Sequence, residues 1–475
     1  MKKYLLVLSL LCFLSANEYQ EWLKTQEKEY HHYKKSFDQE FVDALKKDWL
    51  QFQSSYTLNP YKENKPKVLN SIDNAHSLNQ KEIKKSKILV IKKANKQEDS
   101  KKVFEEKNIP SHEHLNKISF SFYSQDISIS YDEKHTGFKK NNKDAFSAFW
   151  NDISKSKYQS TLKQFEDYSR KLNLNDWAKY LLIYKSAYQI YQDKNMANLF
   201  TWFYLSKMNY DVKIAFNDNN IYLISKLEHK LYEVSYLKIK DQRYYVLSAK
   251  KPIKNIGKVY TYKNTYERAN KSLSFTSSKA IKLFGNIKDK VLRFSYGKKE
   301  YKIKAKYSLD LIDFYSTFPQ SDYKVYFNST HSLLLSSSLL KELRIIIEGK
   351  TELEAINILL RFVQTAFSYK NDKENFLKEN VLFPEETIFY SYSDCEDRSI
   401  LFNFLVKNLS NLDIIALKYD NHLSNAIAFT SYVKGDSTQF NNKRYVVSDP
   451  TYINANIGQT MPIYKNKKFK IIDIK

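Results

Sequence analysis

Cysteine and glycine are scarce in this chain, and their scarcity limits what it can be. Only two of its 475 residues are cysteine and only seven are glycine. Cys12 lies in an N-terminal segment that we expect to be removed, which leaves Cys395 as the single thiol of the mature chain. A disulfide framework is therefore excluded, and a lone cysteine in an oxidising compartment is a candidate reactive group.

Several familiar signals are also missing. No apolar run after the N-terminus has the length of a transmembrane helix. The chain has no P-loop, no dinucleotide-binding fingerprint, no G-x-S-x-G elbow and no nucleic-acid-binding motif. Cys395, His422 and Asp449 could in principle bind zinc, but they lie 27 residues apart and include no short-spaced pair of ligands. The sequence therefore predicts no cofactor, no metal and no nucleic-acid partner.

The chain is strongly basic, but its charge is not concentrated. Its 77 Lys and Arg residues exceed its 53 Asp and Glu residues, giving a formal net charge of +24. Such an excess can attract nucleic acid or anionic envelope polymers. The lysines are spread along the whole sequence beside many Asn, Tyr and Phe residues, which indicates a compositional bias rather than a binding patch.

The first residues have the order of a secretory signal. The segment "MKKYLLVLSLLCFLSANEYQEW" has two lysines, an apolar run and small residues at Ser15 and Ala16. We expect residues 1–16 to be removed and the chain to be exported to the periplasm or cell envelope; a retained anchor is the alternative. Leu11, directly before Cys12, is too large for a lipoprotein signal.

Residues 17–56 predict a charged amphipathic helix with an aromatic stripe, which could dock on the protein itself or on an envelope partner. The segment "EYHHYKKSFDQEFVDALKKDWLQF" resembles the N-terminal module of membrane-bound lytic murein transglycosylases, and the resemblance implies work at the cell envelope. It leaves open that the chain is a tethered assembly factor. Residues 57–116, rich in Lys, Asn, Ser and Glu, predict a solvated linker.

The rest of the chain predicts an α+β fold. Alternating apolar residues in "KISFSFYSQDISISYDE" indicate a hairpin, and helical and strand patterns then follow to the C-terminus. The last helix is followed by strands near 412–418, 424–432 and 443–449. We divide this part into an α+β domain (117–255), a β-rich segment (256–335) and a C-terminal domain (336–475).

Two parts of the chain resemble each other at a shift of 200 residues. The shift lays "NMANLFTWFYLSKMNYDVKIAF" over "CEDRSILFNFLVKNLSNLDIIAL", with helix and strands in the same order. Chance matching of two αβ stretches is the alternative to duplication. At this shift Asn195 takes the place of Cys395 and Ala249 the place of Asp449, so the first copy would be a catalytically inactive scaffold.

Three residues of the C-terminal domain form a candidate catalytic group. Cys395 begins the helix "SILFNFLVKNL", where free N–H groups and the helix dipole favour a thiolate, although neighbouring carboxylates oppose it. His422 precedes a strand and Asp449 ends the next strand, which permits them to converge on the helix start. A nucleophile, a base and a carboxylate that orients the base are the elements of a catalytic triad.

Around these residues, "SDCEDRS", "NHLSNAIAF" and "VVSDPTY" resemble the transglutaminase-like superfamily of papain-type enzymes. The resemblance implies that Cys395 is the nucleophile, His422 the general base and Asp449 its orienter, with a thioester intermediate formed from an amide. Ser393 stands where the family has Gly, and Leu423 and Ser424 where it often has an aromatic residue. The backbone N–H of Cys395 is the natural oxyanion donor, and Tyr392 and Gln364 are candidates for the second.

These observations leave two classes of function open. The first is an exported cysteine-dependent amide hydrolase or acyl-transferase acting on a peptide or protein, including peptides linked to peptidoglycan. The second is a non-catalytic envelope-binding or scaffold protein that keeps the fold. Reactivity of the Cys395 thiol distinguishes them, because a structural cysteine reacts slowly at neutral pH.

Overall fold

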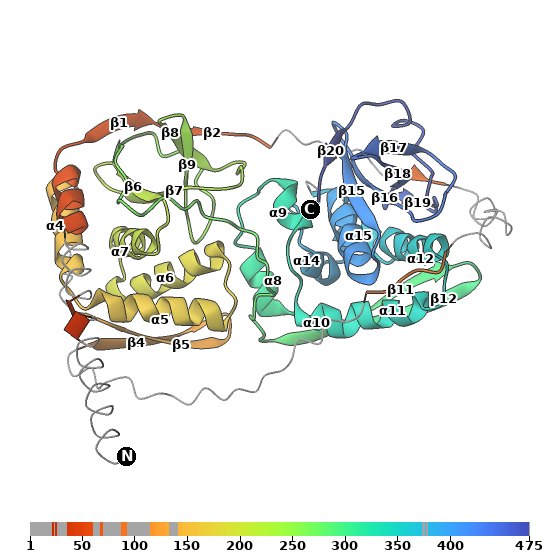
Figure 1. The fold of residues 1–475 in the computed structure, drawn as a ribbon, viewed down its shortest axis with the longest axis horizontal. Coiled ribbons are helices and arrows are strands. Elements are labelled where there is room, and N and C mark those ends of the chain that lie inside the picture. The colour runs from red at the N-terminus through yellow and green to blue at the C-terminus, as the bar shows by residue number, and fades with distance from the viewer. Residues whose placement is uncertain are drawn as a thin grey trace, which may run out of the picture.

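The computed structural model describes residues 21–22, 24–25, 36–59, 67–69, 87–92, 115–132, 141–372, 376 and 379–474. The expected signal segment and most of the expected linker lie outside these residues. The described chain forms two lobes of mixed helix and antiparallel sheet (Figure 1), as the α+β prediction requires. No helix among the described residues is long and apolar enough to cross a membrane.

The first lobe carries a seven-stranded sheet in the order β1-β10-β6-β7-β9-β8-β2, with helices beneath it and a two-stranded hairpin below them (Figure 1). Asn142, Asn175 and Asp193 cap helices α4, α6 and α7 by accepting backbone N–H groups. The elements of this lobe are β1 (Trp49–Gln53), β2 (Ser55–Tyr56), β4 (Asn116–Phe122), β5 (Gln125–Tyr131), α4 (Lys143–Ser154), α5 (Tyr158–Lys171), α6 (Asp176–Tyr191), α7 (Lys194–Lys207), β6 (Val212–Phe216), β7 (Ile221–Lys226), β8 (Ser235–Ile239), β9 (Gln242–Val246) and β10 (Lys258–Tyr262).

The second lobe carries a five-stranded sheet in the order β17-β18-β16-β15-β20, again with helices between it and a hairpin (Figure 1). Thr351 and Asp394 cap α12 and α15. The elements are β3 (Lys67–Val68), β11 (Ile287–Tyr296), β12 (Lys299–Ser308), α8 (Leu309–Tyr315), α9 (Tyr323–Phe327), α10 (Leu333–Leu335), η1 (Ser336–Leu340), α11 (Lys341–Ile347), α12 (Glu352–Thr365), β13 (Ser368–Tyr369), α14 (Pro384–Phe389), β14 (Tyr392–Ser393), α15 (Cys395–Leu409), β15 (Asp413–Lys418), β16 (Leu423–Ala428), β17 (Ser437–Phe440), β18 (Lys443–Ser448), β19 (Tyr452–Ile453) and β20 (Lys470–Ile472).

The two lobes repeat one arrangement. The order β10-β6-β7-β9-β8 of the first sheet corresponds to β20-β15-β16-β18-β17 of the second, and every pair of neighbours is antiparallel. Asn198, in α7, donates to the carbonyl of Ile221, and Ser399, in α15, donates to the carbonyl of Leu423. The same helix-to-strand bond in both lobes supports duplication over chance.

The structural alignment differs by one or two residues from the shift of 200. The helix caps Asp193 and Asp394 correspond, so Lys194 takes the place of Cys395, and Asn195 does not. By the strand registers, Asn220 of the first lobe is equivalent to His422 of the second. Likewise, Ser248 and not Ala249 is equivalent to Asp449. Hydrogen-bond register decides this alignment because it fixes which side chains share a position.

The predicted N-terminal helix ends earlier than expected, at residue 45. Helix occupies residues 36–45, and residues 49–53 form β1, which pairs with β10, instead of continuing the helix to residue 56. Phe41 is buried against Trp150, with ring centroids 4.6 Å apart, and Asp38 accepts the indole N–H of Trp150 at 3.0 Å. The described part of the aromatic stripe therefore docks on the protein's own first lobe.

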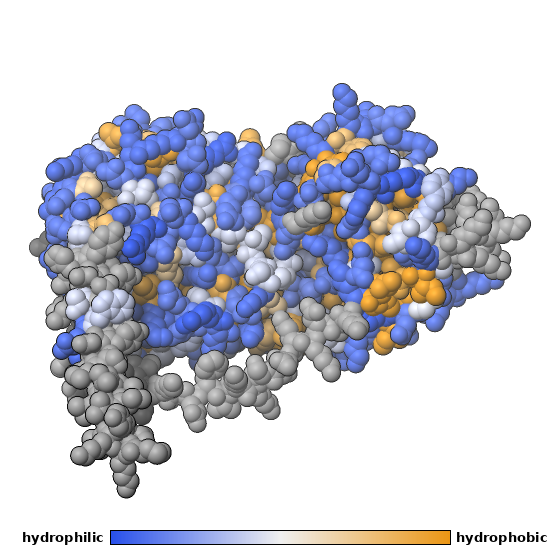
Figure 2. Space-filling view, viewed as in Figure 1, coloured by the Kyte–Doolittle hydropathy of each residue, from blue (hydrophilic) through white to orange (hydrophobic). Residues whose placement is uncertain are grey.

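Two further predictions differ in detail from the structure. Residues 256–335, expected to be β-rich, hold β10, β11 and β12, but α8, α9 and α10 follow the β11–β12 hairpin. Ser308 caps α8, and Leu311, Ile312 and Phe314 are buried at helical spacing. In the expected linker, β3 pairs with β19, and Ile88 bridges Thr351. Leu89 is buried while Ile88 and Val90 are exposed, and Ile345 of α11 is exposed as well, in the lobe where Figure 2 shows an apolar area.

Candidate functional site

The candidate nucleophile is the first residue of α15. Asp394 accepts the N–H of Asp397 at 3.3 Å, and the Asp397 carboxylate accepts the N–H of Asp394 at 3.3 Å, which fixes the helix start. Cys395 follows this cap and is 1% exposed. Its thiol donates to Oε2 of Glu396 at 3.1 Å. The helix start thus holds the thiol, but in a buried position and against a carboxylate.

His422 and Asp449 form a buried pair. His422 Nε2 lies 2.8 Å from Oδ2 of Asp449, and the other carboxylate oxygen accepts the backbone N–H and hydroxyl of Thr451 at 3.0 and 2.8 Å. Burial alone would raise the pKa of Asp449, but His422 and these donors hold it below its usual value. A charged Asp449 requires a proton on Nε2, which leaves Nδ1 as the imidazole nitrogen that can accept one.

The first residue of α15 and the first residue of β16 lie at the same end of this packed helix–strand pair. Ser399, one turn into the helix, donates to the carbonyl of Leu423 at 2.8 Å. Leu423 directly follows His422, and Ser399 lies one turn after Cys395. The structure therefore brings the beginning of α15 close to the beginning of β16, which His422 directly precedes. Asp449 follows the last residue of β18 and reaches the same place.

Gln364 has a different place from the one expected. Its side-chain amide donates to the carbonyls of Asp449, Tyr452 and Ala455 at 3.1, 2.9 and 3.0 Å, all within the buried loop that follows β18. Its backbone carbonyl accepts from Arg398 of α15 at 3.2 Å. Because its amide is committed to these carbonyls, Gln364 positions the Asp449 loop instead of serving as an oxyanion donor.

Tyr392 and Ser393 form β14, which pairs with β13 directly before the helix cap. The ring of Tyr392 is exposed and lies under the ammonium of Lys370, 5.1 Å from the ring centroid. Ser393 accepts the Nε–H of Arg398 at 3.0 Å. The serine thus adds a buried hydrogen bond to the segment that leads into Cys395.

Two tyrosines that the sequence analysis missed pack on the imidazole. Tyr464 stacks on His422 with ring centroids 4.6 Å apart and an interplanar angle of 14°. Tyr419 lies 5.9 Å from the same ring, and Tyr464 Oη donates to Oδ1 of Asn421 at 3.2 Å. An aromatic ring from near the C-terminus therefore packs on His422, and the sequence has no signal for this contact beyond its abundance of tyrosine.

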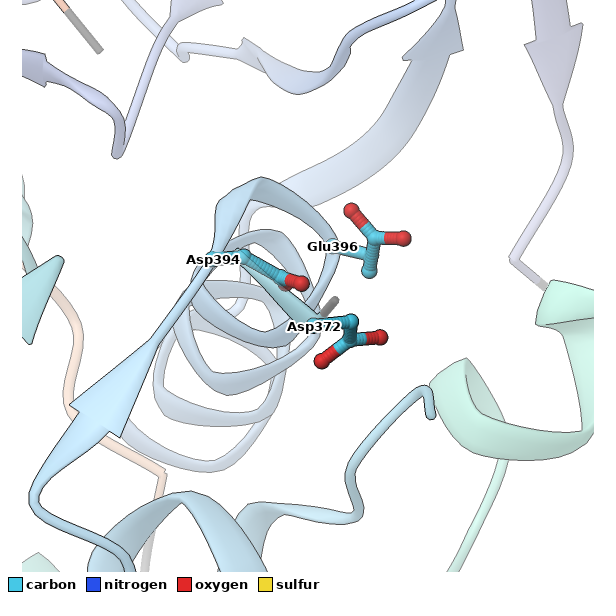
Figure 3. A group of neighbouring side chains, drawn as sticks. All are labelled: Asp372, Asp394 and Glu396. Atoms are coloured by element: carbon cyan, nitrogen blue, oxygen red, sulfur yellow. The ribbon is translucent and has the colours of Figure 1, made fainter. Parts of the chain in front are cut away.

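Three buried carboxylates surround the first turn of α15. Asp372, Asp394 and Glu396 each offer an oxygen, and these atoms lie within 4.8 Å of one another (Figure 3). Among the described residues this is the group whose geometry could hold a metal ion, in place of the Cys, His and Asp considered from the sequence. Like charges this close favour a proton or a cation among them. The carboxylates also oppose a thiolate on Cys395.

Comparison with protein-family models, with curated proteins and with solved structures finds no match to this chain. The functional interpretation therefore depends on the site itself. Its elements are a thiol at a helix N-terminus, an imidazole oriented by a buried carboxylate, and a loop fixed by Gln364. Such a set can perform nucleophilic acyl transfer.

Proposed function

We propose that the protein is an exported, cysteine-dependent amide hydrolase or acyl-transferase with a transglutaminase-like C-terminal domain. The observation that carries the proposal is the His422–Asp449 pair, with its 2.8 Å hydrogen bond, at the strand mouths beside the helix that begins at Cys395. A buried carboxylate that fixes one imidazole nitrogen prepares the other nitrogen for proton transfer.

In the proposed reaction, Nδ1 of His422 takes the proton of the Cys395 thiol, and the thiolate attacks the amide carbonyl carbon. The backbone N–H of Cys395 stabilises the oxyanion that forms. The imidazolium gives its proton to the departing amine, and the C–N bond breaks to leave a thioester. Water or a second amine then attacks the thioester, with His422 again taking the proton, and the thiol is restored.

In the proposed scheme, the observed arrangement of the thiol is a resting one. The thiol donates to Glu396 and is almost fully buried. Productive chemistry in this scheme requires the thiol to turn from Glu396 toward His422 and the covering side chains to admit an amide. The proposed substrates are peptides or proteins, including peptides linked to peptidoglycan, and the proposed location is the periplasm or cell envelope.

The proposal is tested by the rate of Cys395 alkylation with iodoacetamide between pH 4 and 9. We expect a reactive thiolate at neutral pH in the wild type and its loss in His422→Ala. The control is His229→Ala, because His229 is a half-buried histidine of the first lobe that contacts Ser274. Cys395→Ser measures any background from Cys12. Ordinary thiol reactivity that is unchanged in His422→Ala would overturn the proposal.

A second candidate, a non-catalytic binding or scaffold protein, is favoured by one specific observation. Cys395 is almost fully buried, its thiol contacts a carboxylate, and two more carboxylates lie nearby. This environment suits an inert thiol, and the first lobe shows the same frame with Lys194 in place of the cysteine. Slow alkylation in wild type and variants alike would select this candidate.

A further inference from the structure

We infer that the second lobe contains a binding site for a small carboxylate, separate from the Cys395 site. A cavity of about 330 Å³ lies between the tip of the β11–β12 hairpin, helix α12 and the loop after β19. Its polar lining comes from Arg293, Ser295, Glu300, Arg361, Thr365 and Asn454. The volume lies at the lower end of the usual range for ligand pockets, about 300–1,000 Å³.

The central observation is the environment of Arg361. Its side chain is 7% exposed, and its guanidinium donates only to neutral acceptors: Oδ1 and the carbonyl of Asn454, and Oδ1 of Asn456. Its Nε is buried and donates to no acceptor among the described residues. Among these residues Arg361 has no ion pair with a carboxylate. A buried charge that lacks a counter-charge is costly and points to a missing anion.

A second buried arginine has carboxylates nearby. Arg398 also donates to neutral acceptors, the Ser393 hydroxyl and the carbonyls of Gln364 and Phe367, but it lies on the helix start that Asp394 and Asp397 form. Burial lowers its pKa to about 10, against the raising effects of Tyr369 and of these two carboxylates. For Arg361, burial lowers the pKa and the phenol of Tyr296 is the opposing group. Both guanidiniums are buried, and they differ in the carboxylates nearby.

The rest of the lining favours a carboxylate as the ligand. Arg293 lies at the cavity with 58% of its side chain exposed, and its Nη1 is 3.9 Å from Oε1 of Glu300, itself 63% exposed. That pair is long and solvated, so Arg293 can turn to an incoming anion at little cost. Phe294 supplies an apolar wall. The planar guanidinium fork of Arg293 matches the two oxygens of a carboxylate, and Arg361 adds its buried positive charge.

The site also adjoins the loop that carries Asp449. Arg361 and Gln364 are one turn apart on α12, and both donate to this loop. Arg361 donates to Asn454 and Asn456, and Gln364 donates to the carbonyl of Asp449. A ligand bound at Arg361 would therefore act directly on the position of this loop. Binding itself needs no activity of Cys395, so it can be tested whether or not the protein is an enzyme.

The test uses two matched ligands, acetyl-dialanine and its C-terminal amide, at constant ionic strength. Their affinities for the full chain are measured by calorimetry and by the shift of the thermal unfolding midpoint with ligand concentration. We expect the acid to bind and the amide to bind at least about tenfold more weakly. Chloride, added as the sodium salt, and inorganic phosphate are the other anions whose binding is compared.

Three variants locate the site. We expect Arg361→Gln and Arg293→Glu each to weaken binding of the acid about ten- to a hundredfold. Arg243→Gln, at an exposed arginine of the first lobe, should leave binding unchanged. If Arg361→Gln fails to fold, Arg293→Glu decides alone. Equal binding of acid and amide, stronger binding of phosphate than of the acid, or unchanged affinity in Arg293→Glu would each overturn the inference.

Discussion

Gln364 offers the sharpest test of how the candidate site is built. Its amide is 1% exposed and lies within hydrogen-bond distance of three backbone carbonyls, those of Asp449, Tyr452 and Ala455. Replacement by Leu keeps the side-chain size and the helix propensity but removes both N–H donors. The three carbonyls are then left in the protein interior without that donor.

The expected cost follows from the chemistry of an amide. An NH₂ group has two hydrogens, so two full hydrogen bonds are lost. The Ala455 carbonyl is left without a donor, at a cost of about 1–3 kcal/mol. The carbonyls of Asp449 and Tyr452 keep the backbone N–H groups of Tyr452 and Ala455, so the second lost bond costs about 0.5–1.5 kcal/mol. The total is about 1.5–4.5 kcal/mol, which is a large part of the stability of a typical domain. With a urea dependence of about 1–3 kcal/mol per molar, we expect the unfolding midpoint of the second lobe to fall by about 1 M or more.

The assay combines urea unfolding with the alkylation rate of Cys395 in the folded protein. Gln164→Leu is the matched control, since its amide donates to Ser130 and Ser160 in the first lobe at 3.2 and 3.1 Å. Both variants should lose stability, but only Gln364→Leu should change thiol reactivity, because only Gln364 holds the loop of Asp449. An unfolding midpoint equal to that of wild type would refute this account of Gln364.

Two further predictions concern charge. In Asp449→Asn we expect thiol reactivity to fall, and the acid sensitivity of the second lobe to weaken in a pH series of urea titrations. The reason is that the lowered pKa of Asp449 adds stability above the unfolded value of about 4 and loses it as pH falls through the folded value. Burial lowers the pKa of Lys213 to about 8 despite the opposing effect of Asp211, so the folded state binds this proton more weakly than the unfolded state. Lys213→Met should therefore stabilise the first lobe by about 1–3 kcal/mol at pH 7, with the gain gone near pH 10.5; a loss of stability at pH 7 would contradict this.

The sequence was most informative where a pattern is local. The capped start of α15 at Cys395, and the places of His422 before β16 and Asp449 after β18, follow from short-range apolar periodicity and turn residues. The bond between His422 and Asp449 agrees with the predicted order of nucleophile, base and orienter. Local pattern could not give the distances, because convergence depends on how the strands twist and pack.

Features that depend on distant segments were missed or misplaced. Tyr464 reaches His422 from the tail, and Arg361 depends on Asn454 for its acceptors. β1 resembles a continuation of the preceding helix in sequence, but pairing with β10 makes residues 49–53 a strand, so tertiary context overrides propensity. Gln364 was assigned a chemical role because its packing against the Asp449 loop has no sequence signal.

A comparison of the two lobes distinguishes the residues that build the shared fold from the residues of the proposed reaction. Both lobes keep a capped helix, the side-chain bond from that helix to the first residue of the second strand, and the same strand order. These shared features lie in the body of the fold. The three differences, Lys194 for Cys395, Asn220 for His422 and Ser248 for Asp449, all lie at helix or strand ends. Positions at element ends can change without disturbing the core, so the proposed reactive group can stand in one lobe while the other keeps the frame without it. The second lobe is thus the place to test for the proposed chemistry.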